Sequence, residues 1–158
     1  MLVASFRPST ITERMWADSL LAAERAHLAR LALWAMTSLL AGTAVVAILR
    51  VRGLASPLLR HFALQMAAWG AVELLLVWAA RRGLELRDAG AARSLERFLW
   101  LNNGLDLGYV AVGVTLAVAG WTFGRRLGAV GAGTGIVIQG LALLILDLHL
   151  ARHLATLV

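Results

Sequence analysis

Apolar residues along the chain are gathered into four long blocks that are separated by short polar segments. The blocks cover residues 31–49, 62–80, 99–121 and 129–150. Each is about 19–23 residues long, which is enough for an α-helix to cross the ~30 Å hydrocarbon core of a bilayer. Because no block alternates apolar and polar residues with a period of two, no strand competes with this assignment. The pattern predicts an all-α membrane protein, a bundle of four transmembrane helices.

The segment before the first block predicts a further helix, either cytoplasmic or lying at the membrane interface. Thr10 and Glu13 have the spacing of a capping box, in which each side chain accepts a hydrogen bond from a free backbone N–H of the other. A helix is expected from about Ile11 and can run straight into the first span, because no breaker intervenes. Charged residues throughout this segment exclude the apolar core of a cleavable signal peptide. The expected parts are an N-terminal segment 1–30, a bundle 31–150 and a C-terminal tail 151–158.

Composition and charge indicate the same class of protein and orient it. Hydrophobic residues make up 60% of the chain and charged residues 15%, against about 45–50% and 25% in soluble domains. The chain has no Lys, and ten Arg residues lie before the first span, between the second and third, and after the fourth, against five in the two opposite loops. Because Arg is enriched in cytoplasmic loops, we expect both termini in the cytoplasm, and the lipid bilayer of a bacterial inner membrane as the first partner.

The sequence lacks the features of several functional classes. Cysteine is absent, which excludes disulfides, thiolate metal sites and Cys nucleophiles. There is no nucleophile with an adjacent base, no metalloprotease His-Glu-x-x-His motif and no phosphate-binding loop followed by Lys, so we expect no enzyme. The net charge of +6 comes from Arg at the ends of the blocks without interleaved aromatic residues. We therefore expect no nucleic-acid partner.

Polar side chains inside three of the four blocks are the candidates for a functional site. A charged side chain near the middle of a bilayer costs at least ~2.5–3.5 kcal/mol, so such residues usually face the bundle interior. Counting about 1.5 Å per residue from the cytoplasmic ends places Glu73 and Asp106 at a similar depth of roughly 10–12 Å, where they can meet. Helical spacing puts further polar residues on the same faces. The candidate cluster consists of Gln65, Trp69, Glu73, Asn102, Asn103, Asp106, Tyr109, Gln139 and Asp147.

Two functions fit this cluster, and the sequence leaves both open. In the first, amides and carboxylates join the helices by hydrogen bonds, and the protein is an accessory, scaffolding or assembly subunit of a larger membrane complex, or a homo-oligomer. In the second, Glu73, Asp106 and Asp147 bind a proton, a cation or a small polar ligand, because two acids lie at one depth and no Arg lies inside any block. A dry interior favours the first function, and a cavity that reaches Asp106 from the cytoplasm favours the second.

Small residues on the third and fourth blocks predict tight packing between helices. Gly131, Gly135 and Gln139 recur every four residues on the fourth block, and Gly113 continues the face of Asp106 and Tyr109 on the third. Small residues at this spacing let helix backbones approach closely. We therefore expect Gly113, Gly131 and Gly135 to lie in helix–helix contacts.

The four histidines raise the question of a metal or a haem. His27, His149 and His153 lie on the cytoplasmic side, whereas His61 opens the second block on the outer side. His149 and His153 share a helix face, and with His27 they are the candidate metal ligands. A bis-histidine haem needs two histidines at similar depth inside facing spans, and no such pair is present. We expect neither a metal nor a haem, and no other cofactor.

Three segments resemble an uncharacterised family of small four-span bacterial membrane proteins. They are Asn103-Gly-Leu-Asp106-Leu-Gly-Tyr109, then Gly133-Thr-Gly-Ile-Val-Ile-Gln139-Gly with the later Asp147, and Gln65-x-x-x-Trp69-Gly. The resemblance covers roughly residues 30–150. It implies a fold and a location, and it implies no activity.

Overall fold

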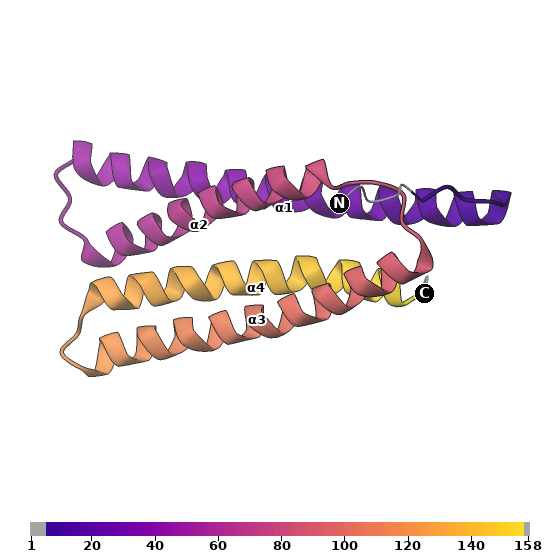
Figure 1. Ribbon diagram of the computed structural model, residues 1–158. Helices are drawn as coiled ribbons and strands as arrows, with labels where there is room; N and C mark the ends of the chain where they lie inside the picture. The colour runs from indigo at the N-terminus through magenta and orange to yellow at the C-terminus, as the bar shows by residue number, and fades with distance from the viewer. Residues whose placement is uncertain (1–5, 157–158) are drawn as a thin grey trace.

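The computed structural model of the chain describes residues 6–156, which form four α-helices joined by short loops. Each helix is long and apolar enough to cross a membrane, and residues 6–156 contain no strand. The predicted all-α, four-helix membrane fold is therefore confirmed. The outermost parts of the predicted N-terminal segment and tail, residues 1–5 and 157–158, lie outside the described residues. The helices are α1 Ile11–Val51, α2 Pro57–Arg82, α3 Ala89–Thr122 and α4 Leu127–Ala155 (Figure 1).

Helix α1 begins at the predicted capping box and continues without a break into the first apolar block. The hydroxyl of Thr10 accepts a hydrogen bond from the backbone N–H of Glu13 at 3.1 Å, and the Glu13 carboxylate accepts one from the backbone N–H of Thr10 at 3.3 Å. This confirms the predicted start of the helix. A helix of 41 residues is about 60 Å long, roughly twice the thickness of the hydrocarbon core. Its N-terminal turns therefore extend beyond the other helices, as Figure 1 shows.

The four helices form two hairpins that lie side by side. Helix α1 packs against α2, α3 packs against α4, and the hairpins join mainly through α2 and α4 (Figure 1). Within residues 6–156, α2 and α3 make no close backbone contact, although they follow each other in the chain. The loops within the hairpins lie at one end of the bundle, which we call the hairpin end. The loop between α2 and α3 and the end of α4 lie at the other, which we call the terminal end.

Glycine residues make the close contact within each hairpin possible. A Cβ atom at Gly70 would lie 2.6 Å from the carbonyl oxygen of Ala35 on α1, and one at Gly113 would lie 2.7 Å from the carbonyl oxygen of Gly133 on α4. Real Cβ atoms do not approach a backbone oxygen this closely, so only glycine allows these helix separations. Between the hairpins, Gly131 lies directly against the carbonyl of Leu58. Helix α4 therefore packs through glycine against both α2 and α3.

An apolar cluster closes the terminal end of the bundle. It joins α1, α3 and α4 through Leu20, Leu99, Leu154 and their neighbours. The α4 helix runs to Ala155, five residues past the predicted boundary at 150, and Leu154 is fully buried in this cluster. Residues 151–155 thus belong to the bundle and are not a separate tail, because an apolar turn of helix gains more from packing here than from exposure to water.

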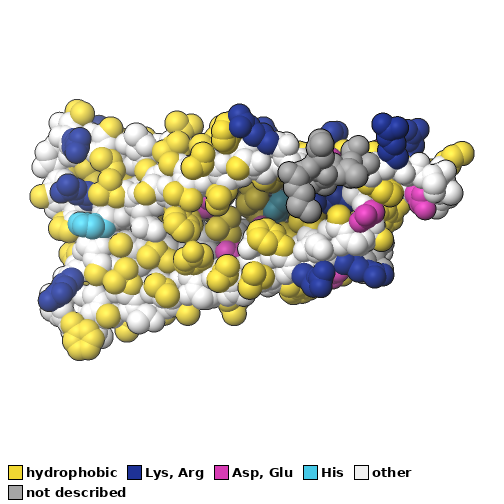
Figure 2. Space-filling view, in the orientation of Figure 1, with side chains coloured by type: hydrophobic (Ala, Val, Ile, Leu, Met, Phe, Trp, Pro, Cys, Tyr) yellow, Lys and Arg dark blue, Asp and Glu magenta, His cyan; other side chains and the backbone are white. Residues whose placement is uncertain are grey.

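Large apolar side chains cover the outside of the helices. Ile145 is 67% exposed and Leu75 is 63% exposed, whereas Gln139 is 1% exposed. Figure 2 shows hydrophobic side chains along the middle of the visible face, with Arg gathered toward its two ends. This is the reverse of a water-soluble protein, in which large apolar side chains are buried. The surface therefore matches lipid, and the interior holds the polar groups.

Candidate functional site

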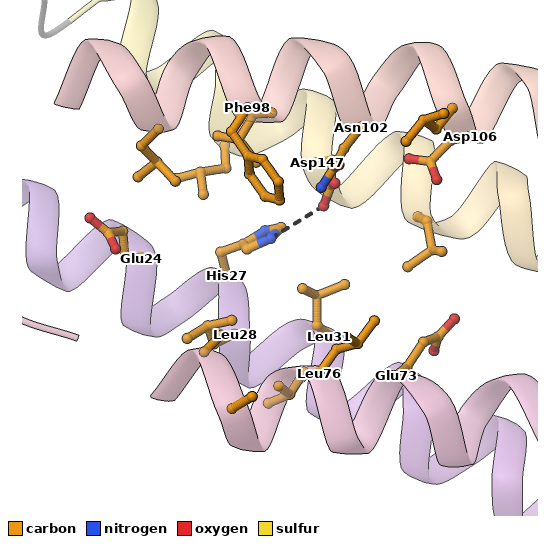
Figure 3. A pocket seen from close by; sticks show the side chains of 18 of the residues that line it. Glu24, His27, Leu28, Leu31, Glu73, Leu76, Phe98, Asn102, Asp106 and Asp147 are labelled. Atoms are coloured by element: carbon orange, nitrogen blue, oxygen red, sulfur yellow. Dashed lines mark ion pairs between the residues drawn. The ribbon is translucent and has the colours of Figure 1, made fainter. Parts of the chain in front are cut away.

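The inward-facing polar side chains surround a cavity of about 820 Å³ in the terminal half of the bundle. All four helices and the α2–α3 loop contribute to its wall (Figure 3). Most of the lining is apolar, and polar or charged side chains interrupt it at a few points. Those side chains are Glu24, His27, Trp69, Glu73, Arg87, Asn102, Asp106, Tyr109 and Asp147.

Helical spacing explains why these residues reach one cavity. On α3, Asn102, Asp106 and Tyr109 follow each other at intervals of four and three residues, so they share one face. On α2, Trp69 and Glu73 are four residues apart and share a face in the same way. The two faces are turned toward each other, since residues of both helices line the same cavity.

Glu73 and Asp106 are the two acids deepest in the cavity from the terminal end. Each is 5% exposed. Within residues 6–156, both carboxylate oxygens of Glu73 and the Oδ2 oxygen of Asp106 have no hydrogen-bond partner. The two carboxylates project into the cavity from opposite walls (Figure 3). Because a buried polar group without a partner costs about 1–3 kcal/mol, this arrangement favours a bound group that supplies the missing partner.

Two side-chain pairs lie nearer the terminal end. Nε2 of His27 lies 3.3 Å from Oδ1 of Asp147, and both side chains are buried. Glu24 accepts two hydrogen bonds from Arg87, from Nε at 2.7 Å and from Nη2 at 3.1 Å. The second pair holds the α2–α3 loop against α1, so that it closes the cavity at this end. Within residues 6–156, Glu73 and Asp106 are thus the cavity acids that form no ion pair.

The aromatic pair Trp69 and Tyr109 bounds the cavity toward the hairpin end. Their ring centroids are 5.5 Å apart, and the rings meet edge to face. This contact bridges α2 and α3, which do not otherwise approach each other closely at this level. Between the aromatic pair and the Arg87 loop, the two helices stay apart along one side of the cavity.

The structure brings together six of the nine residues of the predicted cluster. Trp69, Glu73, Asn102, Asp106, Tyr109 and Asp147 line the cavity, and three others lie elsewhere. Gln65 packs with its Cβ and Cγ against Gly135, in the seam between α2 and α4. Gln139 accepts a hydrogen bond from the indole N–H of Trp34 at 2.6 Å. Asn103 is buried, and its amide atoms have no partner within residues 6–156.

The candidate metal ligands are not gathered at one place. His27 faces the cavity, whereas His149 and His153 are exposed and line a separate hollow of about 200 Å³ beside Arg30. Within residues 6–156, no three His, Asp or Glu side chains lie close enough together to hold a metal ion.

Sequence reasoning did not include Glu24, His27 and Arg87 in the polar cluster. Glu24 and His27 precede the first apolar block, and their place on the cavity wall depends on α1 being one continuous helix. The absence of a breaker before residue 31 was the available signal, together with the three-residue spacing that puts the two side chains on one face. Arg87 lies in a loop, and no periodic pattern marks a loop residue as part of a site.

The chain belongs to a family of unknown function, DUF6992, whose family model matches residues 30–148. The match agrees with the resemblance to an uncharacterised family. It includes Glu73, Asp106 and Asp147, and it begins after Glu24 and His27. No curated protein and no solved structure matches the chain. A function therefore has to be inferred from the geometry of the cavity.

Proposed function

We propose that this protein is a non-enzymatic membrane protein that binds a small cationic ligand in the cavity between its hairpins. Glu73 and Asp106 contact the positive group, and Asn102 supplies a neutral polar side chain beside them. The observation that carries the proposal is the pair of buried carboxylates that face a cavity without protein partners. A cation satisfies both acids at once, because it supplies both charge and hydrogen-bond donors.

The size and lining of the cavity support a small organic ligand. Ligand pockets in proteins usually have volumes of about 300–1,000 Å³ and mostly apolar walls with a few polar groups. A cavity of about 820 Å³ with this lining falls within that range. The alternative interpretation, a cluster that only joins the helices, needs hydrogen bonds between its members. Glu73 makes none of these within residues 6–156, so the accessory-subunit function has less support than ligand binding.

The proposed location is a bacterial inner membrane with both termini in the cytoplasm. This orientation rests on the excess of Arg at the terminal end of the bundle. Under it, the Glu24–Arg87 pair lies at the cytoplasmic face, and the cavity occupies the cytoplasmic half of the bilayer. Glu73 then lies about 12 Å inside Arg81 at the end of α2, measured along the helix.

Thermal unfolding in lipid nanodiscs tests the proposed function. Methylammonium chloride is the probe, and sodium chloride at the same ionic strength is the reference. Binding to the folded protein raises its unfolding temperature, and we expect an increase of about 3 °C or more near saturation. The double variant Glu73→Gln with Asp106→Asn should lose this increase. The matched control changes two exposed acids outside the cavity, Asp18→Asn with Glu85→Gln, and should keep it.

Two results would contradict the proposal. If no ammonium ion of any size stabilises the protein, the cavity does not bind cations. If the double variant retains the full effect, the cation binds elsewhere on the protein.

A further inference from the structure

The cavity has a side opening between α2 and α3 that faces the surrounding membrane. Its ends are set by the Trp69–Tyr109 contact and by the Arg87 loop, and between these limits the two helices make no close backbone contact within residues 6–156. We call this opening the window. Figure 2 shows it as a hollow in the visible face, with acidic and histidine side chains at its bottom.

Apolar side chains form the edges of the window. Val72 and Leu76 line it on α2, and Phe98 and Leu105 line it on α3. These four side chains are between 44% and 62% exposed, although they also belong to the cavity wall. They therefore connect the acid pair inside to the lipid-facing surface outside. A ligand held here has its polar group at the acids and its apolar part along these side chains.

We infer that the ligand is an amphipathic amine, an ammonium group carrying a hydrocarbon chain, which reaches Glu73 and Asp106 from the membrane through the window. This inference rests on the proposed cation binding and adds the class of ligand and its route. A bare metal ion does not fit, because no three acidic or histidine side chains within residues 6–156 converge on one point. A small hydrated cation would leave most of the apolar wall without contact. A hydrocarbon chain covers that wall and keeps the window edges in apolar surroundings.

A series of alkylammonium ions tests the class of ligand. Binding of methylammonium, butylammonium and octylammonium to the protein in nanodiscs is measured by thermal unfolding, with 1-octanol as the neutral control. We expect octylammonium to bind at least tenfold more tightly than methylammonium, because its chain is removed from water in the cavity. The Glu73→Gln/Asp106→Asn variant should lose this binding, and 1-octanol should give no effect that depends on the two acids.

The outcomes separate this inference from the proposed function. Equal affinity for methylammonium and octylammonium, lost in the double variant, would overturn the amphipathic ligand and leave cation binding intact. Equal effects of octylammonium and 1-octanol, unchanged in the double variant, would overturn the amphipathic amine, and the same behaviour of methylammonium would overturn cation binding as well. Absence of binding by every ammonium ion would also overturn both.

The route is tested by narrowing the window. Leu76→Trp with Leu105→Trp places two indoles at its edges, and Leu75→Trp with Leu107→Trp places them on the same helices outside the cavity lining. We expect the first pair to slow octylammonium association at least tenfold and the second pair to leave it unchanged. Methylammonium affinity, measured in parallel, reports whether the acid pair is intact. Unchanged association in the first pair, with methylammonium affinity retained, would overturn the lateral route.

Discussion

Single residues in the cavity divide into those with partners and those without. Glu24 is held by Arg87, and His27 by Asp147, whereas Glu73 has no partner within residues 6–156. Partnered groups are fixed in position and contribute to stability, because each satisfies the other in a medium of low dielectric constant. The unpartnered acids of the cavity are the groups that we propose to contact the ligand. Substitutions at the two kinds of residue should therefore have different effects.

The effect of replacing Asp147 on the free energy of unfolding should depend on whether an oxygen atom remains beside Nε2 of His27. Asp147→Asn keeps an oxygen near Nε2 of His27, and we expect only a small change in unfolding temperature. Asp147→Ala leaves the buried imidazole without the oxygen that lies 3.3 Å from Nε2, and a loss of about 1–3 kcal/mol in the free energy of unfolding is expected. Thermal unfolding in detergent measures both. His149→Ala, an exposed position on the same helix, is the control, and a wild-type unfolding temperature for Asp147→Ala would show that the pair adds no stability.

At the scale of helices and loops, Arg87 should hold the α2–α3 loop in place. Arg87→Ala removes both hydrogen bonds to Glu24, so we expect faster amide hydrogen exchange in residues 83–88, measured by mass spectrometry. Opening of such a loop is a local event, and the exchange of the helix interiors should stay the same. Arg93→Ala removes an exposed Arg near the start of α3 and should leave the loop unchanged. Equal exchange in the wild type and the Arg87 variant would mean that the ion pair does not order the loop.

The close approach of α3 and α4 should depend on Gly113. Gly113→Ala places a Cβ atom 2.8 Å from the backbone nitrogen of Val137 and 2.7 Å from the carbonyl oxygen of Gly133. The helices have to move apart, and we expect a loss of about 1–3 kcal/mol in the free energy of unfolding. Gly108→Ala on the same helix meets no atom within 4 Å, so it should be neutral or slightly stabilising. Equal unfolding temperatures for the two variants would contradict the observed seam.

The helices were more predictable than the cavity, for a physical reason. An apolar block of about 20 residues identifies a membrane-spanning helix, and such a block is a local property of the chain. The common depth of Glu73 and Asp106 is also local, because it follows from the rise per residue within each helix. The separation of α2 from α3 depends on how each of these two helices is rotated against α4. Gly131 of α4 packs against α2, and Gly133 of α4 packs against α3. Sequence spacing does not determine this rotation, so the window was not predicted.

Gln65 and Gln139 illustrate the same limit. Spacing placed both on polar faces together with Glu73 and Asp147, yet Gln65 packs in the α2–α4 seam and Gln139 accepts a hydrogen bond from Trp34. On each of the two helices, the residue at one end of the polar face points into the cavity, whereas the residue at the other end contacts a neighbouring helix. A shared face is thus necessary for a shared site but does not ensure it.

The whole molecule combines an apolar exterior with a charge asymmetry between its ends. The α2–α3 loop lies at the terminal end with most of the Arg residues, and the loop between α1 and α2 lies at the hairpin end. If Arg-rich ends stay in the cytoplasm, these two loops lie on opposite sides of the membrane. The window then opens in the cytoplasmic leaflet, and an amphipathic amine would be drawn from that leaflet.

The absence of Cys in the wild-type chain allows a direct test of this orientation in intact cells. Ala55→Cys and Glu85→Cys place single thiols at exposed positions in the α1–α2 loop and the α2–α3 loop. We expect a membrane-impermeant maleimide to label Ala55→Cys in spheroplasts and to label Glu85→Cys only after lysis. Labelling of both after lysis serves as the control for thiol reactivity. The reverse pattern would invert the topology and move the window to the outer leaflet, while labelling of both thiols in intact spheroplasts would mean that α2 does not span the membrane.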